Sequence, residues 1–186
     1  MIVVIIILAV IVIGAIAVIV IRNGMVGARN RVDEAWSGID VQLKRRHDLV
    51  PNLVETVKGY ATHEAKVFQE TAEARANAMK AASVQDTSQA EGKLSGALAE
   101  LRAVAENYPE LRATENFQQL QRDLSEIEDE IQASRRIYNS NVQSYNTRIQ
   151  VFPNSMIAGA TGFDDKDFFE IEAPAEREPV KVNFDN

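Results

Sequence analysis

The hydrophobic pattern of this chain begins with an uninterrupted apolar run. Every residue from position 2 to position 21 is Ile, Val, Leu, Ala or Gly. In a helix, twenty such residues span about 30 Å, which matches the hydrocarbon core of a bilayer. A cleaved signal peptide needs a basic segment before a shorter apolar run, whereas here only Met1 precedes the run. The pattern predicts one transmembrane anchor over residues 1–22, along which lie Ile2, Leu8, Gly14 and Ile21.

Basic residues close to the anchor predict its orientation. Arg22, Arg29 and Arg31 follow the apolar run, and no charged side chain precedes it. Positive side chains near a span tend to stay on the cytoplasmic side of the membrane. We therefore expect the soluble part to lie in the cytoplasm, with a periplasmic or exterior domain as the alternative.

After the anchor, apolar residues recur at alternating steps of three and four, which is the heptad pattern of a long packed helix. The pattern predicts one helix over residues 32–82, with seam positions Val32, Trp36, Ile39, Leu43, Arg46, Val50, Leu53, Val57, Tyr60, Glu64, Val67, Thr71 and Ala74. Pro51 removes one backbone hydrogen bond inside this helix. Because the heptad phase continues across Pro51, we expect a kink there and no domain boundary.

Two more helices are predicted, joined to their neighbours by short connections. A capping box from Ser88 to Glu91 predicts the start of the second, and Pro109 ends or reorients it. The third runs from Thr114 to Val151, where Phe152 and Pro153 stop it. Short connections favour antiparallel neighbours, so residues 23–153 should form an elongated antiparallel three-helix bundle in an all-α protein. The residues expected in its core are Trp36, Leu43, Leu53, Leu124, Ile131 and Tyr145.

Residues 154–186 change in character and form an acidic C-terminal tail. Eight acidic residues outnumber three basic ones there, and Pro174 and Pro179 rule out one continuous helix. A flexible tail is one interpretation. Its aromatic residues favour docking instead, so we expect the segment 152–171 to contact another copy of the chain. The candidate residues for this contact are Phe152, Phe163, Phe168 and Phe169.

Catalytic motifs are absent from the sequence. There is no cysteine for thiol catalysis or zinc–thiolate binding, and His47 and His63 do not form an H-E-x-x-H motif. The phosphate-binding loop and the nucleophile elbow are also missing. A net charge of −7 argues against a nucleic-acid partner. We therefore expect no enzyme, no cofactor and no metal, and the lipid bilayer is the first predicted partner.

Polar residues instead gather at positions that a plain coiled coil fills with leucine. They form one cluster around the proline and one late in the third helix: Arg46, Asp48, Pro51, Asn52 and Glu64, then Arg135, Arg136, Asn139 and Asn146. Polar seam residues fix the register and the choice of partner at a cost in stability. The alternative interpretation is a docking surface for a partner or a second copy.

Several segments of the chain are similar to one known family. They are NRVDEAW at residues 30–36, IDVQLKRR at 39–46, DLVPNL at 48–53, VKGYA at 57–61 and RRIYN at 135–139. Together with the N-terminal span, they make the chain resemble the bacterial LemA family. The resemblance implies a single-span protein of the bacterial inner membrane with a long antiparallel helical domain, and it implies no defined activity.

Two functions fit these features. The leading hypothesis is a non-enzymatic membrane scaffold that self-assembles into a homo-oligomer through its helices and tail. The alternative is an adaptor or regulator of a membrane protease or signalling complex, which would contact an unknown membrane protein through the tail and the residues around Pro51.

Overall fold

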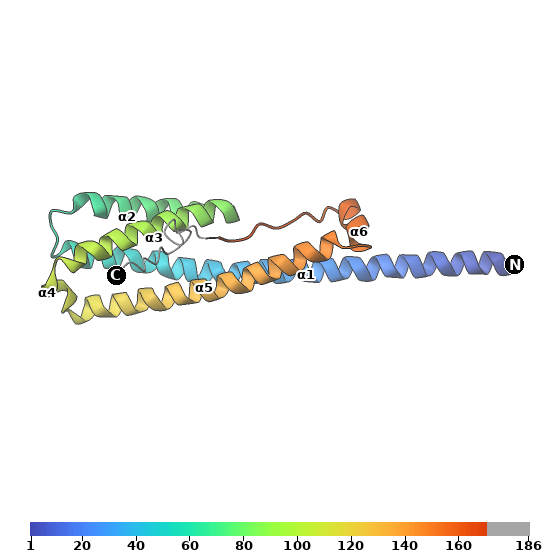
Figure 1. The fold of residues 1–186 in the computed structure, drawn as a ribbon, viewed down its shortest axis with the longest axis horizontal. Coiled ribbons are helices and arrows are strands. Elements are labelled where there is room, and N and C mark those ends of the chain that lie inside the picture. Colours follow the sequence, from blue (N-terminus) through green and yellow to red (C-terminus); the bar gives the residue numbers. More distant parts are fainter. Residues whose placement is uncertain (171–186) are drawn as a thin grey trace, which may run out of the picture. The chain divides into compact units, whose positions relative to one another are not determined.

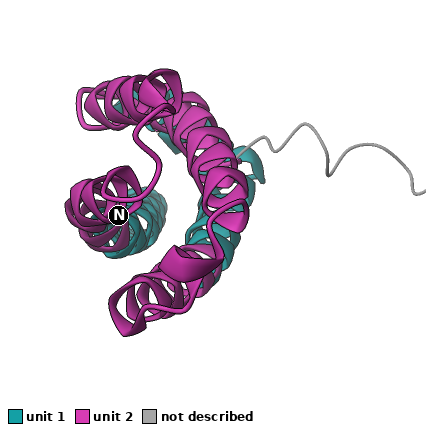
Figure 2. Cartoon of the chain, turned by 90° about the vertical axis from the view of Figure 1, so that its left-hand side faces the viewer, with its two compact units in different colours: residues 1–40, 133–168 teal, residues 41–132, 169–186 magenta. Residues whose placement is uncertain are grey.

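The computed structural model describes residues 1–170 of the chain, and this part is all-helical, as predicted. Residues 171–186, with Ile171, Pro174 and Pro179, lie outside the described part. Figure 1 labels the helices, which are α1 (Ile2–Lys58), α2 (Ala65–Ala78), α3 (Val84–Glu106), α4 (Pro109–Arg112), α5 (Glu115–Gln150) and α6 (Asn154–Thr161). The chain divides into two compact units, coloured separately in Figure 2. Unit 1 comprises residues 1–40 and 133–168, and unit 2 comprises residues 41–132 and 169–186.

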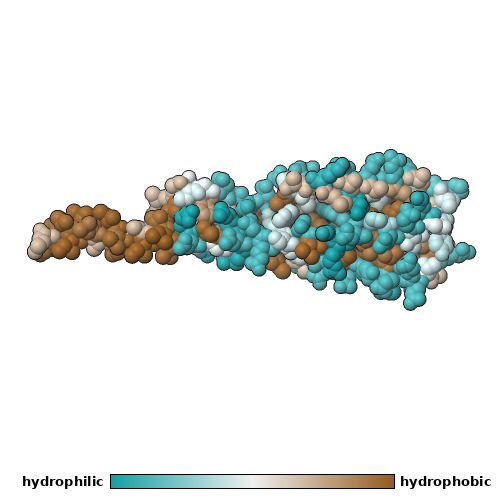
Figure 3. Space-filling model, turned by 180° about the vertical axis from the view of Figure 1, so that it is seen from behind, coloured by the Kyte–Doolittle hydropathy of each residue, from teal (hydrophilic) through white to brown (hydrophobic). Residues whose placement is uncertain are grey.

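The N-terminal part of α1 is the predicted apolar helix. Its side chains from residue 2 to residue 20 are exposed, and Figure 3 shows them as a continuous hydrophobic surface. Within the described residues, α1 is the helix long and apolar enough to cross a membrane. The same helix continues without a break through Pro51, as the heptad phase predicted.

The predicted helix over residues 32–82 is wrong beyond Lys58. There α1 ends in a tight turn, in which the backbone amides of Tyr60 and Ala61 both donate to the Val57 carbonyl, at 3.0 and 2.9 Å. Ala61 is fully buried, whereas the predicted seam residue Tyr60 is exposed. The chain then reverses and begins α2, which packs against α3. The three-helix prediction is therefore corrected: four long segments, from α1, α2, α3 and α5, form unit 2 in the described part.

Unit 2 has an apolar core to which all four segments contribute. Its buried residues are Val50, Leu53, Val57, Ala61, Phe68, Ala78, Leu94, Leu98, Leu101, Ala105, Leu111, Phe117, Leu120 and Leu124. Five of the six residues predicted for the core, all except Trp36, are buried. Trp36 is half-buried in unit 1, where its ring packs against the Tyr138 ring with centroids 5.3 Å apart.

The ends of the later helices correct two more predictions. Helix α3 begins before the expected capping box: Ser83 is the N-cap, and its hydroxyl accepts from the Asp86 amide at 3.0 Å. Ser88 and Glu91 lie inside α3, and both are buried. Helix α5 agrees with its prediction to within one residue at each end. The tail is not irregular from its start, because α6 forms there and ends at Gly162, whose φ of 70° suits glycine.

Candidate functional site

A buried cluster of charged side chains lies in unit 2 around Arg46. The Arg46 side chain is 0% exposed. Its guanidinium donates to the Glu91 carboxylate of α3, to Glu128 Oε1 of α5 at 2.7 Å and to Ser95 Oγ of α3 at 3.2 Å. Burying a charge is costly unless it is paired and hydrogen-bonded, and Arg46 meets both conditions through Nη1 and Nη2, while its buried Nε has no hydrogen-bond partner among the described residues. One side chain of α1 thus joins three helices of the unit.

Glu91 binds a second residue of α1. His47, next to Arg46 in sequence, places Nε2 at 2.6 Å from Glu91 Oε1. The Glu91 side chain is fully buried, so its carboxylate depends on these two neighbours in place of water. This arrangement fixes the rotation and height of α3 against α1, because a shift of one residue would separate the groups. The register role of Arg46 stays a prediction, which the Arg46 variants described in the Discussion test.

Pro51 creates a binding site for α2 on the backbone of α1. In an α-helix, the amide of residue 51 would donate to the carbonyl of residue 47, and proline has no amide hydrogen. The His47 carbonyl instead accepts from Arg75 Nε of α2, at 2.7 Å. The proline thus removes the usual helical donor to this carbonyl inside a continuous helix, and Arg75 of α2 donates to it.

The other residues of the first predicted cluster point elsewhere. Asp48, Pro51 and Asn52 are exposed, while Arg46, Val50 and Leu53 face the core. The helical repeat separates the two sets onto opposite sides of α1. Glu64 is half-buried just before α2, where its side chain makes no capping hydrogen bond. Of this cluster, only Arg46 enters the buried site.

The second predicted cluster lies in unit 1, where Asn146 binds the backbone of a C-terminal segment. Residues 163–168 form this segment, which we call the strap. Asn146 Nδ2 donates to the Lys166 carbonyl, and the Lys166 amide donates to Asn146 Oδ1, both at 2.9 Å. Lys166 Nζ also reaches Asp33 Oδ1 of α1 at 3.5 Å. Arg135 and Asn139 are half-buried and Arg136 is exposed.

Two tyrosines of α5 bind the strap on either side of Lys166. Tyr145 Oη donates to the Asp164 carbonyl and Tyr138 Oη to the Asp167 carbonyl, each at 2.9 Å. Burial raises the pKa of Tyr138 to about 12, and the carboxylates of Asp167 and Asp33 act in the same direction. Burial also raises the pKa of Tyr145, against an opposing effect of Arg29. Both phenols therefore stay protonated as donors at neutral pH.

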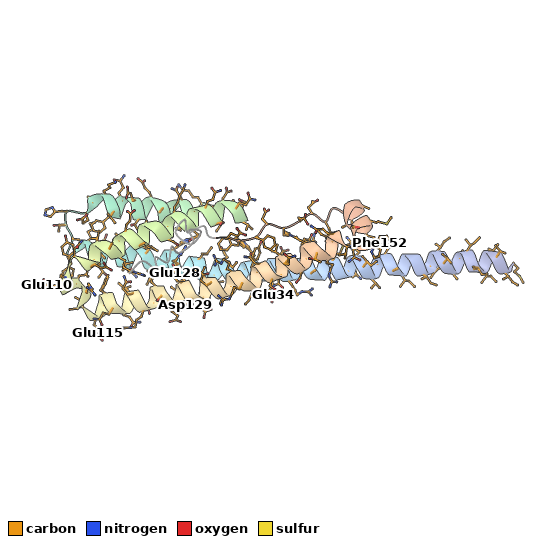
Figure 4. The ribbon with its side chains drawn as sticks, in the orientation of Figure 1. Glu34, Glu110, Glu115, Glu128, Asp129 and Phe152 are labelled. Atoms are coloured by element: carbon orange, nitrogen blue, oxygen red, sulfur yellow. The ribbon has the colours of Figure 1, made fainter. Side chains whose placement is uncertain are left out.

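The four phenylalanines predicted to contact another copy have different environments. Phe163 and Phe169 are buried within the chain itself, and the Arg29 guanidinium lies 5.3 Å from the centroid of the Phe163 ring. The expectation that these two rings dock on a second copy is corrected, because their own chain already covers them. Phe168 is partly exposed, and Phe152 is 79% exposed. Figure 4 labels Phe152 at the end of α5, beside α6.

The sequence analysis missed four contributors to these sites. Glu91 was assigned to a helix cap, although it lies three residues before Leu94 and so extends the buried Leu94, Leu98, Leu101 series. Tyr138 and Tyr145 were treated as seam residues, and their seven-residue spacing on one helix face was the signal for a shared partner. No pattern in the sequence indicated that Arg75 belongs to a site.

These features define an all-helical protein with one candidate membrane span at its N-terminus. The model of the LemA family matches residues 35–184, and the chain belongs to that family. Magnetosome proteins MamQ 1 and MamQ 2 of Paramagnetospirillum magneticum are each 28% identical over 170 residues, covering 77% of this chain and 62% of theirs. Protein LemA of Metamycoplasma hominis is 27% identical over 139 residues, covering 74% of this chain and 63% of its own. The chain thus spans about 62% of the length of the first of these curated relatives.

Proposed function

We propose that this protein is a non-enzymatic scaffold, anchored in the bacterial inner membrane by residues 1–22. The observation that carries the proposal is the continuity of α1. A single helix contains the exposed apolar stretch, then the residues that bind the strap in unit 1, then Arg46 in unit 2. Most polar side chains of both sites bind one another or the backbone, which favours a structural role for these residues.

The proposed orientation places the soluble part in the cytoplasm. Arg22 and Arg31 are exposed just after the apolar stretch, as expected for side chains that stay on the cytoplasmic side. Reporter fusions after Asn186 test this orientation. We expect activity from a cytoplasmic reporter, and activity from a periplasmic reporter alone would reverse the assignment.

We further propose that copies of the scaffold associate through their soluble helices. Exposed apolar patches bounded by polar residues mark interaction sites between proteins. Ile137 is the residue with which we probe α5 for such a site, since it is 60% exposed next to the exposed Arg136. The small residues Gly14, Ala15 and Ala17 offer close packing between anchors only over a short length.

Light scattering in detergent tests the association. We expect a discrete particle whose protein mass is a multiple of 20.6 kDa. Ile137→Ser should shift the particle toward smaller species, while the nearby exposed control Ser140→Ala should leave it unchanged. A lone protomer would refute self-assembly. If that protomer co-purified with a membrane protein, the adaptor alternative would be favoured, with the exposed Asp48 and Asn52 as its first contact candidates.

A further inference from the structure

Within unit 1, two contacts define how α5 runs along α1. Asn141 Nδ2 donates to the Arg31 carbonyl at 3.3 Å. Seven residues later on α5, Arg148 Nη1 lies 2.9 Å from where a Cβ on Gly24 would be, which is seven residues earlier on α1. The two helices are therefore antiparallel with a constant register. Helix α5 ends at Gln150, which this register places level with Arg22, so the chain leaves α5 at the C-terminal end of the apolar stretch.

Large apolar side chains are exposed at this level. They are Val151, Phe152 and Met156, which we call the apolar tip, and Phe152 and Met156 are 79% and 70% exposed. Figure 4 labels Phe152 where α5 ends alongside α1. The tip thus adjoins the C-terminal end of the apolar stretch, which is the level at which an anchored α1 leaves the hydrocarbon core.

Basic side chains accompany the apolar tip. Arg22 and Arg148 are both exposed, and each lies within four residues of the boundary on its own helix. Segments that lie in the membrane interface bury Trp, Phe and Leu side chains at the boundary of headgroups and acyl chains, while Lys and Arg are attracted to anionic lipids. Apolar tip and arginines together have the composition of an interfacial contact.

We propose that the apolar tip inserts into the interfacial layer of the bilayer that holds α1. The tip is thereby assigned to lipid and not to a second copy of the chain. This inference rests on the proposed anchoring of residues 1–22. A second contact with the membrane would hold α5 and the adjoining strap at a set height above the bilayer.

Tryptophan fluorescence in vesicles tests the proposal, because Trp36 is the only tryptophan of the chain. Trp36→Phe supplies a silent background that keeps an aromatic ring. Phe152→Trp, Val12→Trp and Ser140→Trp are then made one at a time in this full-length background. Each protein is reconstituted into vesicles of phosphatidylcholine and phosphatidylglycerol that carry bromine at a shallow or a deep acyl position. Ser140 is the matched control, because it is exposed on α5 about 15 Å before the end of that helix at Gln150, two residues before Phe152.

We expect shallow bromine to quench the Phe152→Trp protein at least half as strongly as deep bromine quenches the Val12→Trp protein. The Ser140→Trp protein should keep its emission with either lipid. Quenching of Val12→Trp without quenching of Phe152→Trp would overturn the inference and leave the anchoring intact. A blue-shifted but unquenched Phe152→Trp emission would also overturn it, in favour of a protein partner. If neither protein were quenched, the proposed anchoring itself would fail.

Discussion

The hydrogen bond from Arg75 to the His47 carbonyl, whose usual helical donor Pro51 removes, can be tested by a double-mutant cycle. Arg75→Met removes the Nε donor and keeps an apolar stem, so most of the packing of α2 is retained. The His47 carbonyl then loses the hydrogen bond that α2 donates to it. Losing a hydrogen bond from a charged donor destabilises a protein by about 1–3 kcal/mol. Because Arg75 is half-buried, we expect Arg75→Met to lower the free energy of unfolding by about 1–2 kcal/mol, which lowers Tm by about 2–8 °C in a chain of this size.

Pro51→Ala is the second arm of the cycle. Alanine supplies the missing amide, so the His47 carbonyl can accept the usual helical hydrogen bond. Pro51 is exposed, and proline inside an exposed helix is about 3 kcal/mol less favourable than alanine, so we expect the variant to be at least as stable as the native protein. In the Pro51→Ala background, Arg75→Met should lower the free energy of unfolding clearly less than it does in the native background. The difference, which is the coupling energy, should be about 0.5–1.5 kcal/mol.

Urea unfolding in detergent, followed by far-ultraviolet circular dichroism, measures all four proteins of the cycle. Lys66→Met is the matched control on α2, because Lys66 is exposed and pairs only loosely with Glu70, at 3.5 Å. Its effect should stay within about 0.5 kcal/mol. If Arg75→Met lowered the free energy of unfolding equally with proline and with alanine at position 51, the missing amide of Pro51 would not be the reason that Arg75 stabilises the protein.

Three further changes test the two sites. Arg46→Ala leaves the buried Glu91 carboxylate without its main partner and should lower the free energy of unfolding in urea by about 3–5 kcal/mol. The double variant Arg46→Met with Glu91→Gln should recover at least half of that loss. An equal loss in the two proteins would contradict the ion-pair argument. Asn146→Ala removes both hydrogen bonds to Lys166, so the Lys166 amide should exchange its hydrogen faster; unchanged exchange would mean that Asn146 does not hold the strap. The pKa of Tyr138 is raised to about 12, so the stabilisation by its protonated phenol should be complete below about pH 10 and lost as the pH rises toward 12. Tyr138→Phe should therefore lose less stability between pH 10 and pH 12 than the native protein, as measured by circular dichroism.

Local sequence pattern alone determined the apolar helix and the extent of α5. The apolar stretch is a continuous run of residues, and α5 is a regular heptad series bounded by turn residues, so each signal lies within the element itself. The predicted helix over residues 114–151 therefore matches α5 closely. The continuity of α1 across Pro51 was also predictable, because the heptad phase does not change there.

The end of α1 at Lys58 depended on tertiary structure. Apolar residues continue at helical spacing on both sides of the turn, because α2 needs its own buried face, with Phe68 and Ala78 inside. Two helices that fold back on each other can therefore show the same periodicity as one long helix. The choice is made by the packing of α2 on α3, which no local window contains.

The hydrogen bonds of the strap also could not be predicted from local sequence pattern. Tyr138 and Asn146 are spaced for one helix face, yet their partners are backbone groups of Asp167 and Lys166, twenty or more residues away. A non-helical backbone offers donors and acceptors whatever its side chains are, so its sequence carries no periodic signal of where it binds. The sequence by itself thus determined which faces of the helices are apolar and where polar residues interrupt them. Only the tertiary structure decided which groups those polar residues bind, because these pairings join residues that are distant in the chain.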